Sequence, residues 1–345
     1  MKILGIETSC DETAAAVVED GVNLLSNVVA SSQDIHIEYG GVVPEIAARE
    51  HIQAIIPVVE QALEQAKCSW EDIDGISFVY GPGLSGSLLI GSLTAKTLAW
   101  VYDKPLYPVD HVLGHVYANF LIEPKPEFPL LALIVSGGHS QLVLFENHFK
   151  YQLLGQTLDD AVGEAFDKAA KIIGLPYPGG PAIEKIALEG EAKYDLPIAK
   201  LSNPYDFSFS GLTTAFLRLV QSICGKDYTF PSFKLAELLD EQQVKDLAAS
   251  FQNTAIKTLV KGAKKAYKEF SPKIVVIAGG VAASKALRAE LQKAIPLDLE
   301  YAPINLCTDN AAMIASLGYF ASEHTEPTSP HNIQIEPSLS MKSLD

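Results

Sequence analysis

An internal duplication constrains the fold of this chain more than any other feature. Strand-like segments at residues 2–6, 13–18 and 23–29 alternate with polar turns, which is the pattern of a β-meander. The same unit returns further along the chain, and the match lies in pattern rather than in identity. Its strands are expected at residues 130–135, 140–145 and 151–156. A meander that occurs twice predicts two related α/β lobes.

A second unit is also repeated. Residues 73–80 form a predicted strand that ends in Gly81-Pro82-Gly83 and opens a helix, and residues 273–278 do the same before Gly279-Gly280. Each half thus holds a meander followed later by a strand, a glycine turn and a helix. We expect an N-terminal lobe at residues 1–110, a C-terminal lobe at 111–325 with a helical insertion at about 158–226, and an extended tail at 326–345.

Charge and cysteine content limit the class of protein. The formal net charge of the 345 residues is −16, which argues against broad, unaided binding of nucleic acid, because phosphate contacts need lysine and arginine. Five lysines between residues 257 and 268 are an exception, and they predict either a solvated helix face or a contact with nucleic acid or a partner. Four scattered cysteines, no signal-peptide pattern and no membrane-spanning stretch predict a cytoplasmic protein.

The glycine turns at the strand ends predict a phosphate or nucleotide site. Gly137 and Gly138 allow a close approach of the backbone because they have no Cβ. Gly279 and Gly280 stand just before a helix, where N–H groups and the helix dipole favour anions. A single glycine pair is weak evidence, but equivalent turns in a duplicated chain are much stronger. The chain has no GxxxxGK[ST] segment, so a P-loop is excluded.

The sequence offers one candidate metal site. On a helix, His111 and His115 would share one face, as two ligands of one ion do, although two surface or capping histidines are the alternative. Val112 stands where an HExxH motif has its glutamate, which argues against a zincin peptidase. Asp309, expected at the end of the second lobe, is a plausible third ligand or else the N-cap of a helix at 311–319.

Carboxylates in the first turn are candidates for proton transfer. Glu7, Asp11 and Glu12 follow the first strand, where a carboxylate could orient a nucleophile or act as a base. The alternative, favoured by the sequence alone, is a set of turn-forming and solvated charges. Asp11 and Glu12 are the candidates for a catalytic role.

Several of these motifs together resemble one family. They occur in order over about residues 1–322, and the set is highly specific: Gly5-Ile6-Glu7-Thr8-Ser9-Cys10-Asp11-Glu12-Thr13, Gly40-Gly41-Val42-Val43-Pro44-Glu45, Tyr80-Gly81-Pro82-Gly83-Leu84, His111-x3-His115, Ser136-Gly137-Gly138-His139, Tyr177-Pro178-Gly179-Gly180-Pro181, Gly279-Gly280-Val281 and Thr308-Asp309-Asn310. The chain resembles the TsaD (Gcp/YgjD) family of bacterial tRNA adenosine threonylcarbamoyltransferases.

The resemblance implies a fold and a reaction. The fold is the actin-like and sugar-kinase-like (ASKHA) α/β architecture, with two duplicated ribonuclease-H-like lobes and a cleft between them. The threonylcarbamoyl group of threonylcarbamoyl-adenylate passes to the exocyclic amine of the adenosine 3′ of the anticodon, in tRNAs that read codons beginning with A, and AMP leaves. The expected partners are tRNA, a TsaB-like paralogue and a TsaE-like ATPase.

The resemblance also implies site residues. His111, His115 and Asp309 correspond to ligands of one divalent ion per chain, with iron(II) favoured and zinc or magnesium as alternatives. The substrate-binding residues expected from the resemblance and from the turns are Ile134, Val135, Ser136, Gly137, Gly138, His139, Asp167, Gly180, Glu184, Gly279, Gly280 and Ser284.

One residue departs from the family pattern, and three rival functions remain, of which a non-catalytic scaffold should lack the pair of histidines that is present here. Many relatives have Asn where this chain has Ser284, and serine loses the two-point reach of the amide. A small-molecule kinase of the same fold would share the glycine turns but has no use for the two histidines and Asp309. A metallopeptidase would lack its general base.

Overall fold

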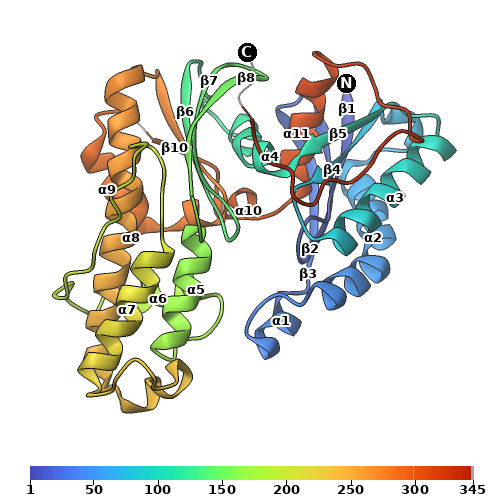
Figure 1. Cartoon of the computed structure of the whole chain (residues 1–345). Coiled ribbons are helices and arrows are strands. Elements are labelled where there is room, and N and C mark those ends of the chain that lie inside the picture. The colour runs from blue at the N-terminus through green and yellow to red at the C-terminus, as the bar shows by residue number, and fades with distance from the viewer. Residues whose placement is uncertain (298, 343–345) are drawn as a thin grey trace. The chain divides into compact units, whose positions relative to one another are not determined.

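The computed structural model describes residues 1–297 and 299–342 (Figure 1). The first sheet contains β1 (Lys2–Glu7), β2 (Glu12–Glu19), β3 (Asn23–Ser31), β4 (Gly75–Gly81) and β5 (Leu106–Asp110). The second contains β6 (Leu130–Val135), β7 (Ser140–Asn147), β8 (Lys150–Gln156), β9 (Ile274–Ala278) and β10 (Leu299–Tyr301). The α-helices are α1 (Gln33–Tyr39), α2 (Pro44–Ala66), α3 (Ser85–Val101), α4 (His111–Tyr117), α5 (Val162–Ile172), α6 (Gly179–Ala187), α7 (Ser210–Ile223), α8 (Glu241–Phe270), α9 (Lys285–Ala294), α10 (Ile304–Cys307) and α11 (Ala311–Ser322).

The two sheets have the same topology, which confirms the duplication. Their strand orders are β3-β2-β1-β4-β5 and β8-β7-β6-β9-β10. In the first sheet β1 pairs antiparallel with β2 and parallel with β4. In the second, β6 pairs in the same way with β7 and β9. The parallel pairs need long crossovers, and the chain makes them through helices.

Successive residues of β1 point to opposite faces of the first sheet, and both faces are covered by helices. Leu4 and Ile6 belong to the buried cluster that includes residues of α2 and α3. Gly5 points to the other face, where a Cβ would lie 2.4 Å from the carbonyl oxygen of Ala311 and 2.6 Å from the backbone nitrogen of Ala315. Glycine at this position therefore lets α11 pack directly against β1.

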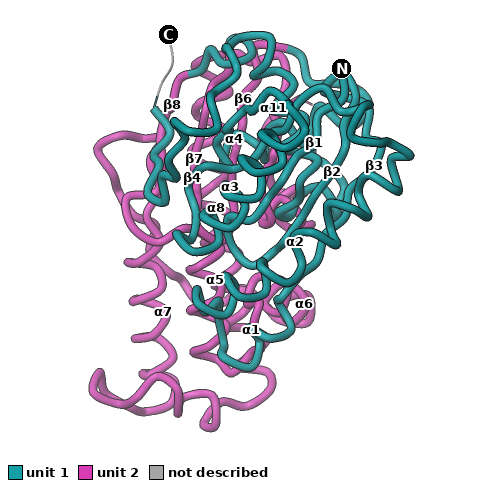
Figure 2. The backbone as a smooth tube through the Cα atoms, turned by 90° about the vertical axis from the view of Figure 1, so that its right-hand side faces the viewer, with its two compact units in different colours: residues 1–127, 146–151, 300–345 teal, residues 128–145, 152–299 magenta. Residues whose placement is uncertain are grey.

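The chain forms two compact units, whose boundaries differ from the expected lobes (Figure 2). Unit 1 contains residues 1–127, 146–151 and 300–345, and unit 2 contains residues 128–145 and 152–299. Residues 343–345 lie outside the described part of the chain. Sequence order cannot show that α11 returns to the first sheet, where Ser77 donates a hydrogen bond of 2.8 Å to the carbonyl oxygen of Ile314. Helix α4 also packs closely on α11, because a Cβ added to Gly114 would lie 2.8 Å from the side chain of Ile314.

The described part of the C-terminal segment, up to residue 342, has no helix or strand beyond α11 and makes hydrogen bonds with other parts of unit 1. The backbone N–H of Glu336 donates to the carbonyl oxygen of Tyr80, and Gly83 donates to Pro337. Lys96 donates from Nζ to the carbonyl oxygen of Ile333, whose side chain is buried. In unit 2 the predicted helical insertion contains α5, α6 and α7. No helix among the described residues is both long and apolar enough to cross a bilayer.

Candidate functional site

Helix α4 positions both histidines of the candidate metal site. It begins at His111 because Asp110 is its N-cap: Asp110 Oδ1 accepts hydrogen bonds from the backbone N–H groups of Val112 (2.6 Å) and Leu113 (3.1 Å). His111 and His115 are one helical turn apart, and their ring centroids are 4.8 Å apart. Both residues are buried, so neither is an ordinary surface histidine.

Asp309 faces the two histidines, and all three residues belong to unit 1. Its Oδ1 lies 3.3 Å from Nε2 of His115 and 3.7 Å from Nε2 of His111. The N-cap of α11 is the next residue, Asn310, whose side chain accepts a hydrogen bond from the N–H of Met313. The alternative role of Asp309 as a helix cap is therefore wrong, as is its expected place in the second lobe.

The three side chains fit a divalent cation. Their ligand atoms lie within 4.8 Å of one another. Two ligands that are each about 2.1 Å from one ion lie about 3.4 Å apart at a tetrahedral angle, close to the observed separations. Among the described residues, neither buried ring nitrogen of His115 has a hydrogen-bond partner, and a bound cation would remove this cost at Nε2, the nitrogen that faces Asp309. Two imidazoles and one carboxylate also form a donor set that iron(II) and zinc accept.

Glu7 orients His111 from the side opposite Asp309. The fully buried Glu7 places Oε2 3.0 Å from Nδ1 of His111, and Ser9 Oγ lies 3.1 Å from the same nitrogen. A proton held on Nδ1 leaves Nε2 free to bind a metal. Burial disfavours the charged ring, but the negative charges of Glu7 and Asp309 outweigh it and raise the pKa of His111 to about 9.

Glu7→Gln is expected to weaken metal binding by about 10- to 100-fold, because it removes the charge that orients His111 and strengthens it as a ligand. Competition with a chelator would measure the affinity for zinc or iron(II). Glu60→Gln, an exposed change on α2, is the matched control. Equal metal affinity in Glu7→Gln and the wild type would show that Glu7 has no part in the site.

The first turn, which holds Asp11 and Glu12, is fixed by a histidine that the sequence analysis missed. His51 on α2 joins the hydroxyl of Thr13 (2.7 Å) to the carbonyl oxygen of Cys10 (3.0 Å). Ser32 donates from its N–H and its hydroxyl to the carbonyl oxygen of Asp11. The sequence signal for His51 was an isolated histidine within an amphipathic helix, which by itself indicates only burial.

Two groups in this turn have strongly raised pKa values. Burial, together with the charges of Asp309 and Asp11, raises the pKa of Glu12 to about 10. Burial also raises the pKa of the Cys10 thiol, so Cys10 stays protonated at neutral pH and cannot act as a thiolate nucleophile. A bound divalent cation would oppose the shift at Glu12, because a nearby positive charge favours the carboxylate.

The residues expected to bind substrate all lie in unit 2, at the ends of β6 and β9 and on the helices beside them. The two strands run in parallel, and Ile134 pairs with Ala278. Val135 ends β6, and the Ser136–His139 turn is closed by a 2.8 Å hydrogen bond from Ser136 N–H to the carbonyl oxygen of His139. The Ser136 hydroxyl accepts from the N–H of His139 at 3.1 Å.

Three glycines of this cluster differ sharply in the space around them. Cβ atoms added to Gly137 and Gly138 would meet nothing within 4 Å, so the turn is open in front of the backbone. Gly279 has φ 89° and ψ 168°, a conformation that only glycine adopts readily. A Cβ at Gly279 would also lie 2.4 Å from the carbonyl oxygen of Val135. This close approach holds the two glycine turns together.

Gly279→Ala is expected to lower the free energy of unfolding by about 2–4 kcal/mol, because it combines a disallowed backbone conformation with a clash against Val135. Gly280→Ala is the matched control, since its Cβ would meet nothing within 4 Å, and it should change stability by less than about 0.5 kcal/mol. Urea unfolding followed by circular dichroism measures both. Equal midpoints for the two variants would contradict the backbone argument.

The polar residues of the cluster are partly engaged within the protein. Asp167 on α5 accepts a 2.6 Å hydrogen bond from the N–H of Gly179, at the start of α6. Gly180 has open space at its Cβ position. Glu184 Oε1 accepts from the hydroxyl of Ser284 (2.9 Å) and from the N–H of Ala286 (3.0 Å), and thus ties α6 to α9.

Ser284 has a clear structural role despite its departure from the family pattern. It is the N-cap of α9, where its hydroxyl accepts a hydrogen bond from the N–H of Leu287 at 3.3 Å. The same hydroxyl donates to Glu184. The serine hydroxyl thus caps α9 and binds Glu184 of α6 at the same time. Both hydrogen bonds use the oxygen that a nucleotide contact would need.

The chain is strongly similar to proteins of one enzyme family. The family model for TsaD, tRNA N6-adenosine threonylcarbamoyltransferase, matches residues 23–316. A protein of that name from Thermomicrobium roseum is 51% identical over 337 residues, covering 94% of this chain and 92% of its own length. The protein of the same name from Symbiobacterium thermophilum is 52% identical over 322 residues, covering 92% and 91%.

Solved structures of distant proteins share the fold. Component A of (R)-2-hydroxyglutaryl-CoA dehydratase from Acidaminococcus fermentans superposes with a TM-score of 0.53 at 15% identity, covering 94% of this chain and 99% of its own. HypF from T. kodakarensis gives a TM-score of 0.58 at 14% identity, covering 93% and 48%. These neighbours agree with the duplicated topology and with the actin-like, sugar-kinase-like fold. The chain belongs to the TsaD family of tRNA N6-adenosine threonylcarbamoyltransferases, and it is a transferase that modifies tRNA.

Proposed function

We propose that this enzyme uses threonylcarbamoyl-adenylate as donor and the adenosine 3′ of the anticodon as acceptor, in tRNAs that read codons beginning with A, and releases AMP. The observation that supports it best is the complete set of His111, His115 and Asp309 in a member of the TsaD family. A kinase would have no use for these three side chains. A peptidase would need the glutamate of an HExxH motif where this chain has Val112.

The donor is an acyl phosphate anhydride, so its acyl carbon is already activated. The attacking amine is a poor nucleophile, because its lone pair is delocalised into the adenine ring. The enzyme therefore has to position the amine and to stabilise the oxyanion that develops on the acyl group. A divalent cation held by His111, His115 and Asp309 would polarise the acyl group and neutralise that charge.

The glycine turns of unit 2 are suited to the phosphate of the adenylate. The N–H groups of Gly137 and Gly138 lie in an open turn, and those of Gly280 and its neighbours begin a short helical segment, Gly280–Ala283. Backbone donors of this kind favour the phosphate both in the substrate and in the departing AMP. Asp167, Gly180 and Glu184 would complete the nucleotide site.

The amine has to lose a proton during transfer. Asp11 and Glu12 are the candidate acceptors in unit 1. Burial and the charges of Asp309 and Asp11 raise the pKa of Glu12 in the protein without a cation, and a bound cation would oppose that shift, so both carboxylates remain candidate acceptors. For the metal itself we propose iron(II), since two imidazoles and one carboxylate on one side of an ion are typical of non-haem iron(II) sites.

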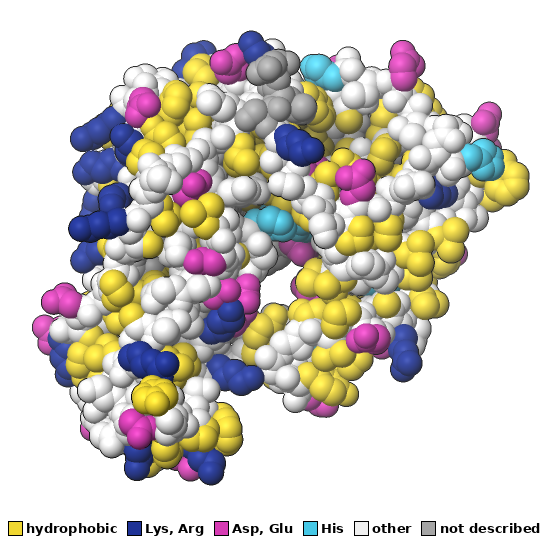
Figure 3. All heavy atoms as spheres, in the orientation of Figure 1, with side chains coloured by type: hydrophobic (Ala, Val, Ile, Leu, Met, Phe, Trp, Pro, Cys, Tyr) yellow, Lys and Arg dark blue, Asp and Glu magenta, His cyan; other side chains and the backbone are white. Residues whose placement is uncertain are grey.

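Partner proteins are part of the proposal. At a net charge of −16 the chain should bind tRNA weakly alone, so a TsaB-like paralogue and a TsaE-like ATPase would assist it. Apolar side chains gather over α2 and α3 in unit 1 (Figure 3) and would suit the paralogue. The exposed members of this surface are Ile52, Ile56, Leu89, Leu93 and Trp100. We also propose that the reaction takes place in the cytoplasm.

The test is transfer of a labelled threonylcarbamoyl group from the adenylate to unmodified tRNA, with and without the two partner proteins. We expect label in the tRNA, more of it when the partners are present, and none in a tRNA that carries guanosine in place of the acceptor adenosine. Phosphorylation of a small molecule by ATP without any transfer to tRNA would refute the proposal.

A further inference from the structure

The C-terminal half of α8 carries an uncompensated row of positive charge. Lys257, Lys261, Lys264, Lys265 and Lys268, which we call the lysine stripe, are all exposed. At 100° per residue they fall within an arc of about 100° on one helix face, over a length of roughly 16 Å. In Figure 3, Lys and Arg side chains gather along the edge of unit 2 beside α8 and α9.

Most of these lysines form no ion pair within the described part of the chain. Among the described residues, Lys265 alone of the five forms an ion pair, at 3.6 Å to Glu269. By contrast, lysines elsewhere are commonly paired, as Lys245 is with Glu189 and Glu241. A helix C-terminus favours lysine through its dipole, but that effect falls off within the last turn and does not reach Lys257 or Lys261.

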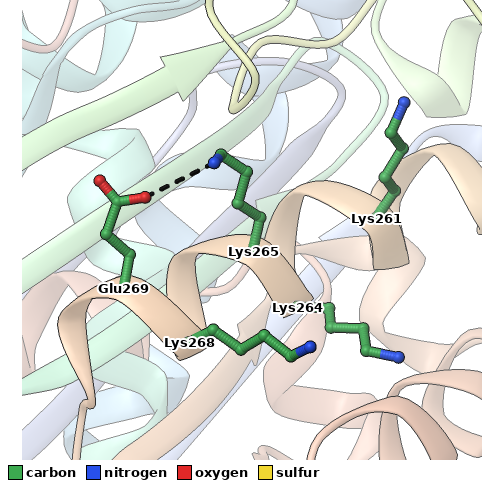
Figure 4. A pocket seen from close by; sticks show the side chains of 5 residues that line it. All are labelled: Lys261, Lys264, Lys265, Lys268 and Glu269. Carbon is green, nitrogen blue, oxygen red and sulfur yellow. Dashed lines mark ion pairs between the residues drawn. The ribbon is translucent and has the colours of Figure 1, made fainter.

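The stripe borders a shallow hollow that is widely open to solvent. Lys261, Lys264, Lys265, Lys268 and Glu269 line a hollow of about 470 Å³ (Figure 4). In Figure 4, Lys261 and Lys265 point to one side of the helix and Lys264 and Lys268 to the other. Ammonium groups on both sides of the helix can reach successive phosphates of one nucleic-acid strand.

We infer that the lysine stripe binds the phosphate backbone of the tRNA substrate. The inference rests on the proposed function for the identity of the nucleic acid. In a chain of net charge −16, a row of free ammonium groups is the surface that a polyanion would select. The contact fixes position and contributes affinity, but it reads no base.

The test compares two triple variants with equal loss of charge. Lys261, Lys264 and Lys268 are changed to Gln in the first, and the exposed Lys125, Lys150 and Lys342 of unit 1 are changed to Gln in the second. The first should raise the KM for tRNA by about tenfold or more at about 0.15 M salt, with kcat and the KM for threonylcarbamoyl-adenylate unchanged. The second variant should change neither kcat nor either KM. Arginine in place of the same three stripe lysines should keep the KM for tRNA at its wild-type value.

The salt dependence of direct tRNA binding gives a second readout, which a purely structural role would not alter. Each lost phosphate contact lowers the slope of log K against log salt by about 0.7–0.9, so the stripe variant should lose about two to three units of slope. Equal slopes and equal KM values in the two variants would overturn the inference. A changed response to the partner proteins, with an unchanged KM for tRNA, would make the stripe a protein contact and would also overturn it.

Failure of the proposed function has a different signature. If the wild type bound tRNA through the stripe but transferred no threonylcarbamoyl group, the proposed donor or reaction would be wrong, and the stripe would still be an RNA contact. If transfer occurred and the stripe variant behaved like the control, only the stripe inference would fail.

Discussion

His115→Ala is expected to lose bound metal and to lower threonylcarbamoyl transfer by more than about 100-fold, which exceeds the usual effect of losing a residue that only orients a ligand. His115 is 1% exposed, and its ring nitrogens have no hydrogen-bond partner among residues 1–297 and 299–342. The position of His115 suits it to bind a cation together with His111 and Asp309. Metal content by elemental analysis and transfer by label incorporation measure the two effects.

A second variant separates loss of metal from loss of folding. Asp309→Asn keeps the shape of a side chain that is 22% exposed and removes its charge, so the fold should persist while metal and transfer are lost. His324→Ala, an exposed histidine of unit 1, is the control and should keep both. Full transfer by metal-free His115→Ala and Asp309→Asn would show that the metal centre has no part in the reaction.

The second large effect is expected at the open turn of unit 2. Gly138→Leu should raise the KM for threonylcarbamoyl-adenylate by about 10- to 100-fold, because a side chain there would fill the space through which a phosphate approaches the backbone N–H groups. Apart from the neighbouring residues in the chain, no described atom lies within 4 Å of a Cβ at this position, and φ is not positive, so stability should change little.

Gly211→Leu is the matched control for this change. Gly211 lies on α7 in the same unit, and it too has nothing within 4 Å of its Cβ position. Calorimetry with AMP as the probe would give the affinity of each variant for the nucleotide. Wild-type AMP affinity in Gly138→Leu would mean that the turn at Ser136–His139 does not hold the phosphate.

The strands and their duplication were predictable because their signals are local. Alternating apolar residues define β1 and β2, and the polar turn between them is short. The partition into compact units was not predictable in the same way. It depends on Gly5 admitting the backbone of α11 at Ala311 and Ala315, a contact between residues more than 300 positions apart.

The candidate site was predictable in its ligands but not in its support. His111 and His115 are one helical turn apart, so the sequence alone could place them on one face. Asp309 needed the family resemblance, because its distance along the chain gives no hint of contact. Ser9 and Glu7 support His111 from a turn whose acidic residues looked like ordinary solvated charges, and only the fold shows that Glu7 is buried.

The most direct test of the account is to count both products of one reaction. Threonylcarbamoyl-adenylate, unmodified tRNA and the metal-loaded enzyme are incubated with the partner proteins, and AMP and the modified nucleoside are quantified by mass spectrometry. The account predicts one AMP for each threonylcarbamoyl group on the adenosine 3′ of the anticodon, and neither product above background with Asp309→Asn. AMP released without modified adenosine, or equal yields from Asp309→Asn, would contradict it.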